Sequence, residues 1–373
     1  MNHSEFRALF PALGERIWLD TPGAPPAARP VTAALTRALE DWTSGTFDWL
    51  DWDRAAPRAR ELFADYLGVE TETVATLGSL SEAAATVATT IPGGEIVVAE
   101  DEFRSNLYPW MRVLGDDVRV RVVPRVAGLS RTDVLLAAIG PETALVAVSE
   151  VITLDGERVD LPSLRRATDD VGARLFVNVT QTLGVLDSRL DELAADYVAV
   201  HGYKWMLCPR GTAWLVVRPD RVADLRPLAP SWKSTGSSQG YFGGGYREAS
   251  DASRCDTSPA WLSWIGAEAA LAVLSGLERA ATQTHCLGLA QRFRDGAAAL
   301  GCLDANAGAP SHIVAVDTPN GESVTASFHR HRIAATVTGN RLRVGFHYFN
   351  DESDVDTTLD ALRIAIDGPD VRR

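Results

Sequence analysis

Between about residues 50 and 220, short apolar runs alternate with helical patterns, and this alternation constrains the fold more than any other feature of the chain. The apolar runs are rich in valine and alanine and predict strands at 74–78, 95–100, 118–123, 144–149, 173–178, 197–200 and 212–217. Amphipathic patterns between several of them predict helices at 81–91, 131–140 and 161–172. Buried strands that alternate with helices are typical of a mostly parallel α/β sheet covered on both faces. Such a sheet binds ligands at the carboxyl ends of its strands.

The C-terminal part of the chain has a different pattern. Residues 231–259 are rich in glycine and serine and predict a long loop, and a strongly helical stretch follows at 261–280. Apolar runs at 312–317, 332–337 and 341–346 predict the strands of a smaller α+β domain. We therefore expect an N-terminal segment (1–15), a large domain (16–255) and a small C-terminal domain (256–373).

The bulk composition excludes several classes of protein. The net charge is −13, which argues against nucleic acid or an anionic membrane surface as the main partner. No apolar run approaches the roughly 20 residues of a membrane span, and the charged N-terminal residues 1–20 do not resemble a signal peptide. The four cysteines are scattered, so we expect neither a metal site nor a disulfide framework, and we predict a cytoplasmic protein.

Lysine is scarce in this chain, and one lysine stands in a distinctive setting. Of 36 basic residues only Lys204 and Lys233 are lysines, and Lys204 lies within HGYKWMLCPRG. Arginine supplies charge and carboxylate binding at least as well, but it does not form an imine with an aldehyde, as a lysine amine does. Lys204 follows the predicted strand at 197–200, so its amine would emerge at a strand's carboxyl end. A plain surface lysine is the alternative interpretation.

Five motifs follow one another in a recognisable order. They are the glycine–serine turn TLGSLSEA, then FRSNLYPW, FVNVTQTLG, HGYKWMLCPRG and RLRVGFHYFNDESDVD. In this order the chain resembles the class V aminotransferase family, from about residue 16 to 365. That family consists of pyridoxal phosphate (PLP) enzymes of fold type I and includes cysteine desulfurases, kynureninase, carbon–sulfur lyases and isopenicillin N epimerase-like proteins. YKWMLCPRG and DTSPAWLSW are most similar to the epimerase-like branch.

The resemblance implies a fold, a cofactor and partners. The fold is a large domain with a mostly parallel seven-stranded sheet, followed by a smaller α+β domain. The cofactor is pyridoxal 5′-phosphate, the substrate is a small-molecule amino acid, and the assembly is a homodimer. Neither nucleic acid nor a membrane is expected as a partner.

The family's cofactor-attaching and phosphate-binding residues map onto two segments. Lys204 takes the position of the Schiff-base lysine. The backbone amides of Ser79 and Leu80 would hold the phosphate at a helix N-terminus, assisted by His201 and Tyr203. The alternatives are plain helix capping at the serine turn, with Ser81 as the cap, and core packing for the two aromatic residues.

Further cofactor contacts are implied by the other motifs. Phe103 aligns with the aromatic or imidazole residue that the family lays over the cofactor ring, although it could be a core residue. Gln181 would contact the cofactor's 3′-oxygen, with strand-end packing as the alternative. In relatives, the segment around Thr257 and Ser258 reaches the phosphate of the neighbouring subunit.

Substrate binding is implied for one arginine. RLRVGFHYFN aligns with the family segment that binds the substrate carboxylate, which gives Arg343, and the planar fork of arginine suits that task. Arg341, two residues earlier on the same strand face, would take this part if the register slips.

The chain departs from the family at the residue that faces the pyridine nitrogen. Relatives carry Asp in a D-x-x-Q pattern, and the carboxylate keeps the ring protonated as an electron sink. Here the residue is Asn178, whose amide can accept from a protonated ring nitrogen or donate to a neutral one. We interpret this as chemistry that tolerates a weaker sink, with an inactivating change as the alternative.

The motifs alone do not select one reaction. Cysteine desulfurases carry a nucleophilic cysteine shortly before the substrate arginine, and residues 332–346 contain none, so that activity is disfavoured. The preferred reaction is β-elimination from an S-conjugated cysteine. Epimerisation and oxidative decarboxylation–deamination are the alternatives. The ten tryptophans favour a bulky substrate of secondary metabolism.

A non-catalytic homologue that serves as a binding subunit is the remaining hypothesis. Only Asn178 supports it, whereas the joint retention of Lys204, Gln181 and Arg343 argues against it.

Overall fold

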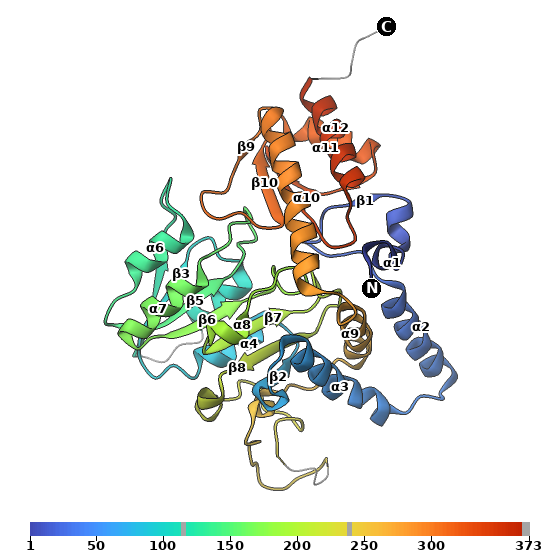
Figure 1. The fold of residues 1–373 in the computed structure, drawn as a ribbon. Helices are drawn as coiled ribbons and strands as arrows, with labels where there is room; N and C mark the ends of the chain where they lie inside the picture. The colour runs from blue at the N-terminus through green and yellow to red at the C-terminus, as the bar shows by residue number, and fades with distance from the viewer. Residues whose placement is uncertain (113–116, 237–240, 368–373) are drawn as a thin grey trace.

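A seven-stranded sheet forms the centre of the computed structural model, which describes residues 1–112, 117–236 and 241–367 (Figure 1). The strand order is β2-β8-β7-β6-β5-β3-β4. The bounds are β2 (Val74–Leu77), β3 (Gly94–Ala99), β4 (Val118–Val123), β5 (Thr143–Ser149), β6 (Arg174–Asn178), β7 (Tyr197–His201) and β8 (Ala213–Val217). All pairs are parallel except those that β8 makes with β2 and β7. The predicted mostly parallel sheet is therefore confirmed.

Helices cover both faces of this sheet because consecutive strand residues point to opposite sides. Ile96 and Val97 of β3 lie in two different apolar clusters. The cluster around Val97 includes residues of α3 (Trp49–Leu67), α6 (Arg131–Ala138) and α7 (Leu161–Val171), and that around Ile96 includes α4 (Leu80–Ala88). Each large apolar side chain buried in these clusters contributes roughly 1.5–3 kcal/mol to folding.

The small domain is built on a second, antiparallel sheet of order β12-β13-β10-β9. Its strands are β9 (Leu303–Asp304), β10 (Ile313–Asp317), β12 (Thr336–Thr338) and β13 (Arg341–Gly345). Its helices are α10 (Arg279–Ala299), α11 (Gly321–Arg330) and α12 (Glu352–Asp367). Figure 1 shows this domain, in orange and red, at one end of the molecule, with the N-terminal helix α1 (His3–Arg7) beside it.

Two contacts bear on the predicted domain limits. The N-terminal strand β1 (Ile17–Trp18) pairs in parallel with β11 (Ile333–Ala334) and so joins the small domain. Helix α9 (Trp261–Leu274) packs against α2 (Arg29–Ser44) and α3, in the core of the large domain. The limits 16–255 and 256–373 stay a prediction, and this packing favours a boundary after α9.

The remaining elements are short. They are α5 (Tyr108–Arg112), α8 (Leu190–Leu193) and 3₁₀ turns at Pro11–Gly14, Thr71–Thr73, Arg104–Asn106, Pro219–Asp224 and Ala252–Cys255. In the predicted loop at 231–259, the described residues include only the last of these turns, and residues 237–240 lie outside the described part. No helix among the described residues is long and apolar enough to cross a membrane.

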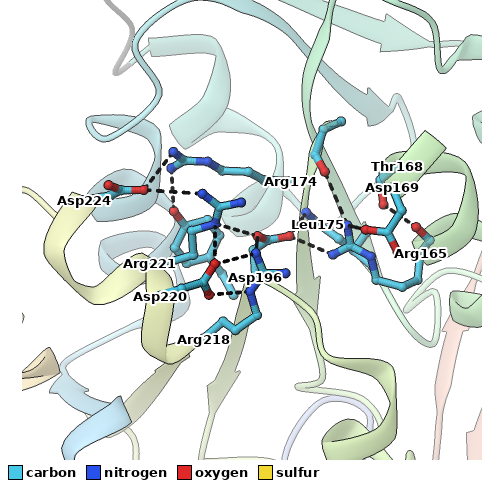
Figure 2. A network of polar contacts seen from close by, with 12 residues as sticks. Arg165, Thr168, Asp169, Arg174, Leu175, Asp196, Arg218, Asp220, Arg221 and Asp224 are labelled. Carbon is cyan, nitrogen blue, oxygen red and sulfur yellow. Dashed lines mark hydrogen bonds and ion pairs between the residues drawn. The ribbon is translucent and has the colours of Figure 1, made fainter. Parts of the chain in front are cut away.

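The buried carboxylate of Asp196 links several segments at the edge of the sheet where β6 and β7 begin. Asp196 directly precedes β7 and accepts hydrogen bonds or ion pairs from Arg165, Arg218 and Arg221, as Figure 2 shows. The backbone N–H of Leu175 also donates to it, at 2.9 Å. This network lies at the opposite edge from the strand ends that carry the predicted site, so its role is structural.

Candidate active site

Three neighbouring strands end at polar residues along the edge of the sheet where the site is predicted. β5 ends at Ser149, β6 at Asn178 and β7 at His201. Ser149 is the register partner of Asn178, and Asn178 is the partner of Ala199. The sequence predicted Asn178 and His201 at strand ends, and the carboxyl ends of parallel strands lie along one edge of their sheet.

Lys204 lies in the turn after β7 and is 4% exposed. Its Nζ is 5.3 Å from the ring centroid of Phe103 and 5.8 Å from that of Tyr203. Burial lowers the pKa of Lys204 to about 7, and the positive charge of Arg343 adds to this effect while Asp20 opposes it. The alternative of a surface lysine is wrong, and near neutral pH a large fraction of this amine is uncharged.

Phe103 is 46% exposed, so it is not a core residue. Its ring lies beside the buried amine of Lys204. The resemblance to the family predicts a stacking residue here, and its contact with a cofactor ring stays a prediction.

The N-terminus of α4 provides the donors for an anion. Ser79 is the N-cap, with its Oγ accepting from Glu82 N at 3.3 Å, so the expectation of a cap at Ser81 was wrong. The helix begins at Leu80 because Ser79 still has extended backbone, with φ −159° and ψ 159°. Amides in the first turn of a helix have no intrahelical acceptor and attract anions.

His201, Tyr203 and Arg210 form a group beside Lys204. The imidazole of His201 contacts the Tyr203 ring edge-on, with 4.5 Å between the two ring centroids. The Arg210 guanidinium carbon lies 4.7 Å from the centroid of the same Tyr203 ring. Burial, with the charges of Arg210 and Lys204, lowers the pKa of His201 to about 4. Its Nε2 is buried without a hydrogen-bond partner among the described residues. Sequence reasoning missed Arg210, although the motif PRG places it six residues after the lysine.

Asn178 is held by hydrogen bonds on both sides of its amide. Its Nδ2 donates to Ser149 Oγ at 2.8 Å, and its Oδ1 accepts from Thr180 N at 3.0 Å. Ser149 in turn donates from its Oγ to the buried carboxylate of Glu102, at 2.6 Å. The sequence did not indicate Glu102 or Ser149, which lie on other segments.

Gln181 is engaged with protein groups on every side. Its Nε2 donates to Pro22 O at 3.2 Å and Thr153 Oγ1 at 3.1 Å, while its Oε1 accepts from Trp205 Nε1 at 2.6 Å. These contacts agree with the alternative role of Gln181, which is packing at the strand end. Its contact with the cofactor's 3′-oxygen stays a prediction.

Arg343, rather than Arg341, is the arginine whose positive charge acts on the amine of Lys204. Its guanidinium donates to Thr153 O at 3.0 Å and Thr336 Oγ1 at 3.2 Å, and its Nε is buried without a partner among the described residues. Burial lowers its pKa, with Asp20 opposing. Arg341 is instead paired with Asp317, at 2.9 and 3.1 Å. Both arginines line a cavity of about 410 Å³ whose lining does not include Lys204.

Thr257 and Ser258 lie beside the strand that leads into the α4 turn. Thr257 N donates to Thr76 O at 3.2 Å, and Ser258 Oγ accepts from Trp232 Nε1 at 2.9 Å. Their contact with the phosphate of a second subunit stays a prediction.

The residues present fit PLP. An aldehyde requires an unprotonated amine, which Lys204 supplies, and a phosphate requires convergent donors, which the start of α4 supplies. The buried, unpartnered Nε2 of His201 lies next to the same lysine. Phe103 supplies a half-exposed aromatic ring on which a flat ligand could stack.

Comparisons with known proteins agree with this fit. The sequence profile of the aminotransferase class V family matches residues 17–358. An uncharacterized aminotransferase of Bacillus subtilis is 25% identical and covers 96% of each chain. Isopenicillin N epimerase of Amycolatopsis lactamdurans is 26% identical over 91% of this chain and 92% of its own. A solved cysteine desulfurase of Thermococcus onnurineus has the same fold, with a TM-score of 0.83, 20% identity and 98% coverage of both chains. The chain therefore belongs to the class V aminotransferase family and is a PLP-dependent enzyme of fold type I.

Proposed function

We propose that this enzyme is a lyase that eliminates a thiol from the Cβ of an S-conjugated cysteine. The observation that carries the proposal is a single buried amine, with a pKa of about 7, beside an apolar aromatic ring. Bound PLP supplies the electron-withdrawing system that makes the substrate's Cα–H acidic. The protein's own residues bind the substrate, keep water out and move protons.

Lys204 serves as the base in this proposal. A general base works best when its pKa is close to the working pH, and burial brings this amine into that range. Its Nζ takes the proton from the substrate's Cα. The same ammonium then holds that proton within reach of the departing sulfur.

The composition of the site favours one-base chemistry. Epimerisation by two bases needs a proton donor on the face of Cα opposite the lysine. The aromatic ring of Phe103 has no proton to give, and His201, with a pKa of about 4, is neutral at pH 7. The absence of a charged donor at these two side chains supports elimination. The Tyr203 hydroxyl is a further donor near Lys204, whose Nζ lies 5.8 Å from the Tyr203 ring centroid, so Tyr203→Phe should leave elimination intact.

A cysteine desulfurase would need an accessible nucleophilic thiolate. All four cysteines of the chain are buried: Cys208, Cys255, Cys286 and Cys302. Burial raises the pKa of each thiol, that of Cys255 to about 12. Their burial supports the exclusion of that activity.

Arg343 would bind the substrate carboxylate. Its guanidinium lines the 410 Å³ cavity, and its planar fork suits a carboxylate. The Arg341–Asp317 pair at the same cavity supplies both signs of charge for a polar substituent on sulfur.

Epimerisation is the second candidate because a relative with that name aligns along nearly the whole chain at 26% identity. A weaker electron sink at Asn178 is compatible with either reaction. Elimination passes the electron pair to the leaving group, and epimerisation returns a proton to Cα.

One experiment separates the two candidates. The holoenzyme is incubated with S-alkyl cysteines and with L-amino acids that lack a leaving group, in deuterated water. Elimination predicts thiol, pyruvate and ammonia in equal amounts from the first set. Deuterium at Cα with inverted configuration and without pyruvate would replace the proposal by epimerisation. Lys204→Ala should abolish both reactions and the borohydride-reducible visible absorption, and Lys233→Ala is the matched control.

A further inference from the structure

The amide of Asn178 has a fixed orientation. The Thr180 backbone N–H can only donate, so the atom that it meets, at 3.0 Å, must be the acceptor Oδ1. The other amide atom, Nδ2, therefore faces Ser149 Oγ at 2.8 Å. A flipped amide would place an N–H against the Thr180 N–H, which is unfavourable in a buried site.

Ser149 holds the same orientation from the other side. Its hydroxyl donates to Glu102 Oε2 at 2.6 Å, and its backbone N–H donates to Glu102 Oε1. Because the hydroxyl proton of Ser149 is donated to Glu102, Ser149 Oγ can only accept a hydrogen bond from Asn178 Nδ2. Glu102, Ser149 and Asn178 are each 5% exposed or less, so water does not compete for these hydrogen bonds.

One hydrogen on Asn178 Nδ2 is left without an acceptor among the described residues. The amide has two N–H donors, and Ser149 takes one of them. Buried donors without a partner are rare, whereas a carbonyl oxygen with one unused lone pair is more readily tolerated. The site therefore calls for an acceptor from the bound ligand.

We infer that Asn178 donates this N–H to the ring nitrogen of PLP, and that the enzyme holds the ring nitrogen unprotonated. Glu102 and Ser149 act as positioning residues that orient the amide. A protonated ring would bring a second donor to a site that already offers one. The inference rests on PLP binding and is independent of the reaction proposed above.

The position of Glu102 gives a reason for the amide. Burial raises the pKa of Glu102, and the hydrogen bonds from Ser149 and Asn106 oppose that rise. A second carboxylate at position 178 would lie one hydroxyl away from this buried carboxylate. Two such charges repel strongly in a medium of low dielectric. An amide keeps the hydrogen bonds of the position without the second charge.

The test is the ¹⁵N chemical shift of PLP labelled at the ring nitrogen and bound to the full-length enzyme. Free PLP at pH values above and below its ring pKa supplies the two reference shifts. We expect the wild-type signal at the unprotonated reference and the Asn178→Asp signal displaced toward the protonated one. A wild-type signal at the protonated reference would overturn the inference without any variant and without an activity measurement.

The positioning role has a separate readout. Ser149→Ala and Glu102→Gln should each weaken PLP binding about ten-fold, roughly the value of one hydrogen bond. Because the two residues act through one chain of contacts, the double variant should lose no more than either single variant. Additive losses, or unchanged affinity, would refute the positioning role.

A matched control separates this effect from general destabilisation. Thr168→Val removes a buried hydroxyl whose Oγ1, among the described residues, donates to Leu164 O and Arg165 O of its own helix, α7. It should leave the PLP affinity and the ¹⁵N shift unchanged. Near-ultraviolet circular dichroism establishes that each variant is folded before titration.

Discussion

Replacement of Asp196 by Asn should destabilise the fold by about 3–5 kcal/mol, the cost of breaking a buried ion pair. Each carboxylate oxygen accepts from two donors. Oδ2 is 2.7 Å from Arg165 Nη1 and 2.9 Å from Leu175 N, whereas Oδ1 is 2.9 Å from Arg218 Nη2 and 3.0 Å from Arg221 Nε. An amide in either orientation therefore turns its NH₂ group toward two N–H donors.

The assay is urea-induced unfolding of the apoprotein, followed by circular dichroism, with Asp220→Asn as the control. Asp220 also contacts Arg218, at 2.6 Å, but its side chain is 59% exposed. Exposed pairs are worth about 0–1 kcal/mol, so the control should change the unfolding free energy little. A cost below about 1 kcal/mol for Asp196→Asn, or equal costs for both variants, would refute the reasoning.

The pH dependence of this cost has a definite sign. The guanidinium and backbone hydrogen bonds hold the pKa of Asp196 below its usual value, although burial opposes them. The stabilisation is therefore fully present above the unfolded pKa of about 3.9 and is lost as the pH falls through the lower folded pKa. Between pH 7 and 5 the difference between wild type and Asp196→Asn should be constant, and it should shrink only in stronger acid.

Four further predictions concern the site and the assembly. The rate at which the apoprotein takes up PLP should rise through about pH 7 and then level off, because the neutral amine of Lys204 reacts; stopped-flow absorbance measures it. Arg343→Gln removes a positive charge that lowers the pKa of Lys204, so the midpoint of that profile should move upward, and a downward shift would contradict the electrostatic argument. The same variant should lower kcat/KM for carboxylated substrates about 10- to 100-fold, with Arg341→Gln as the milder control. Phe242, which is 95% exposed, should lie in the expected homodimer interface, so Phe242→Asp should halve the mass in sedimentation equilibrium; a monomeric wild type would remove that expectation.

The sequence predicted the elements of the sheet because their signals are local. A run of apolar residues indicates by itself that the segment is buried. All seven predicted strands of the large sheet occur within a residue or two of their expected limits. The position of Lys204 at a strand end followed from the same local pattern, together with the chain's scarcity of lysine. Helix starts were less certain: Ser79 and Ser81 are both good caps, and only backbone geometry separates them.

The sequence by itself determined the α/β class and the parallel sheet, and it singled out Lys204 as the amine expected to react with an aldehyde. Only the tertiary structure decided the electrostatics of the site. Glu102, Ser149 and Asn178 come from three separate segments, and Asp20 and Arg343 approach Lys204 from the two ends of the chain. Periodicity records which residues are buried, but it does not record which buried polar groups face one another. The pKa of Lys204 and the orientation of Asn178 depend on those pairings, because charges and hydrogen bonds act between neighbours in space.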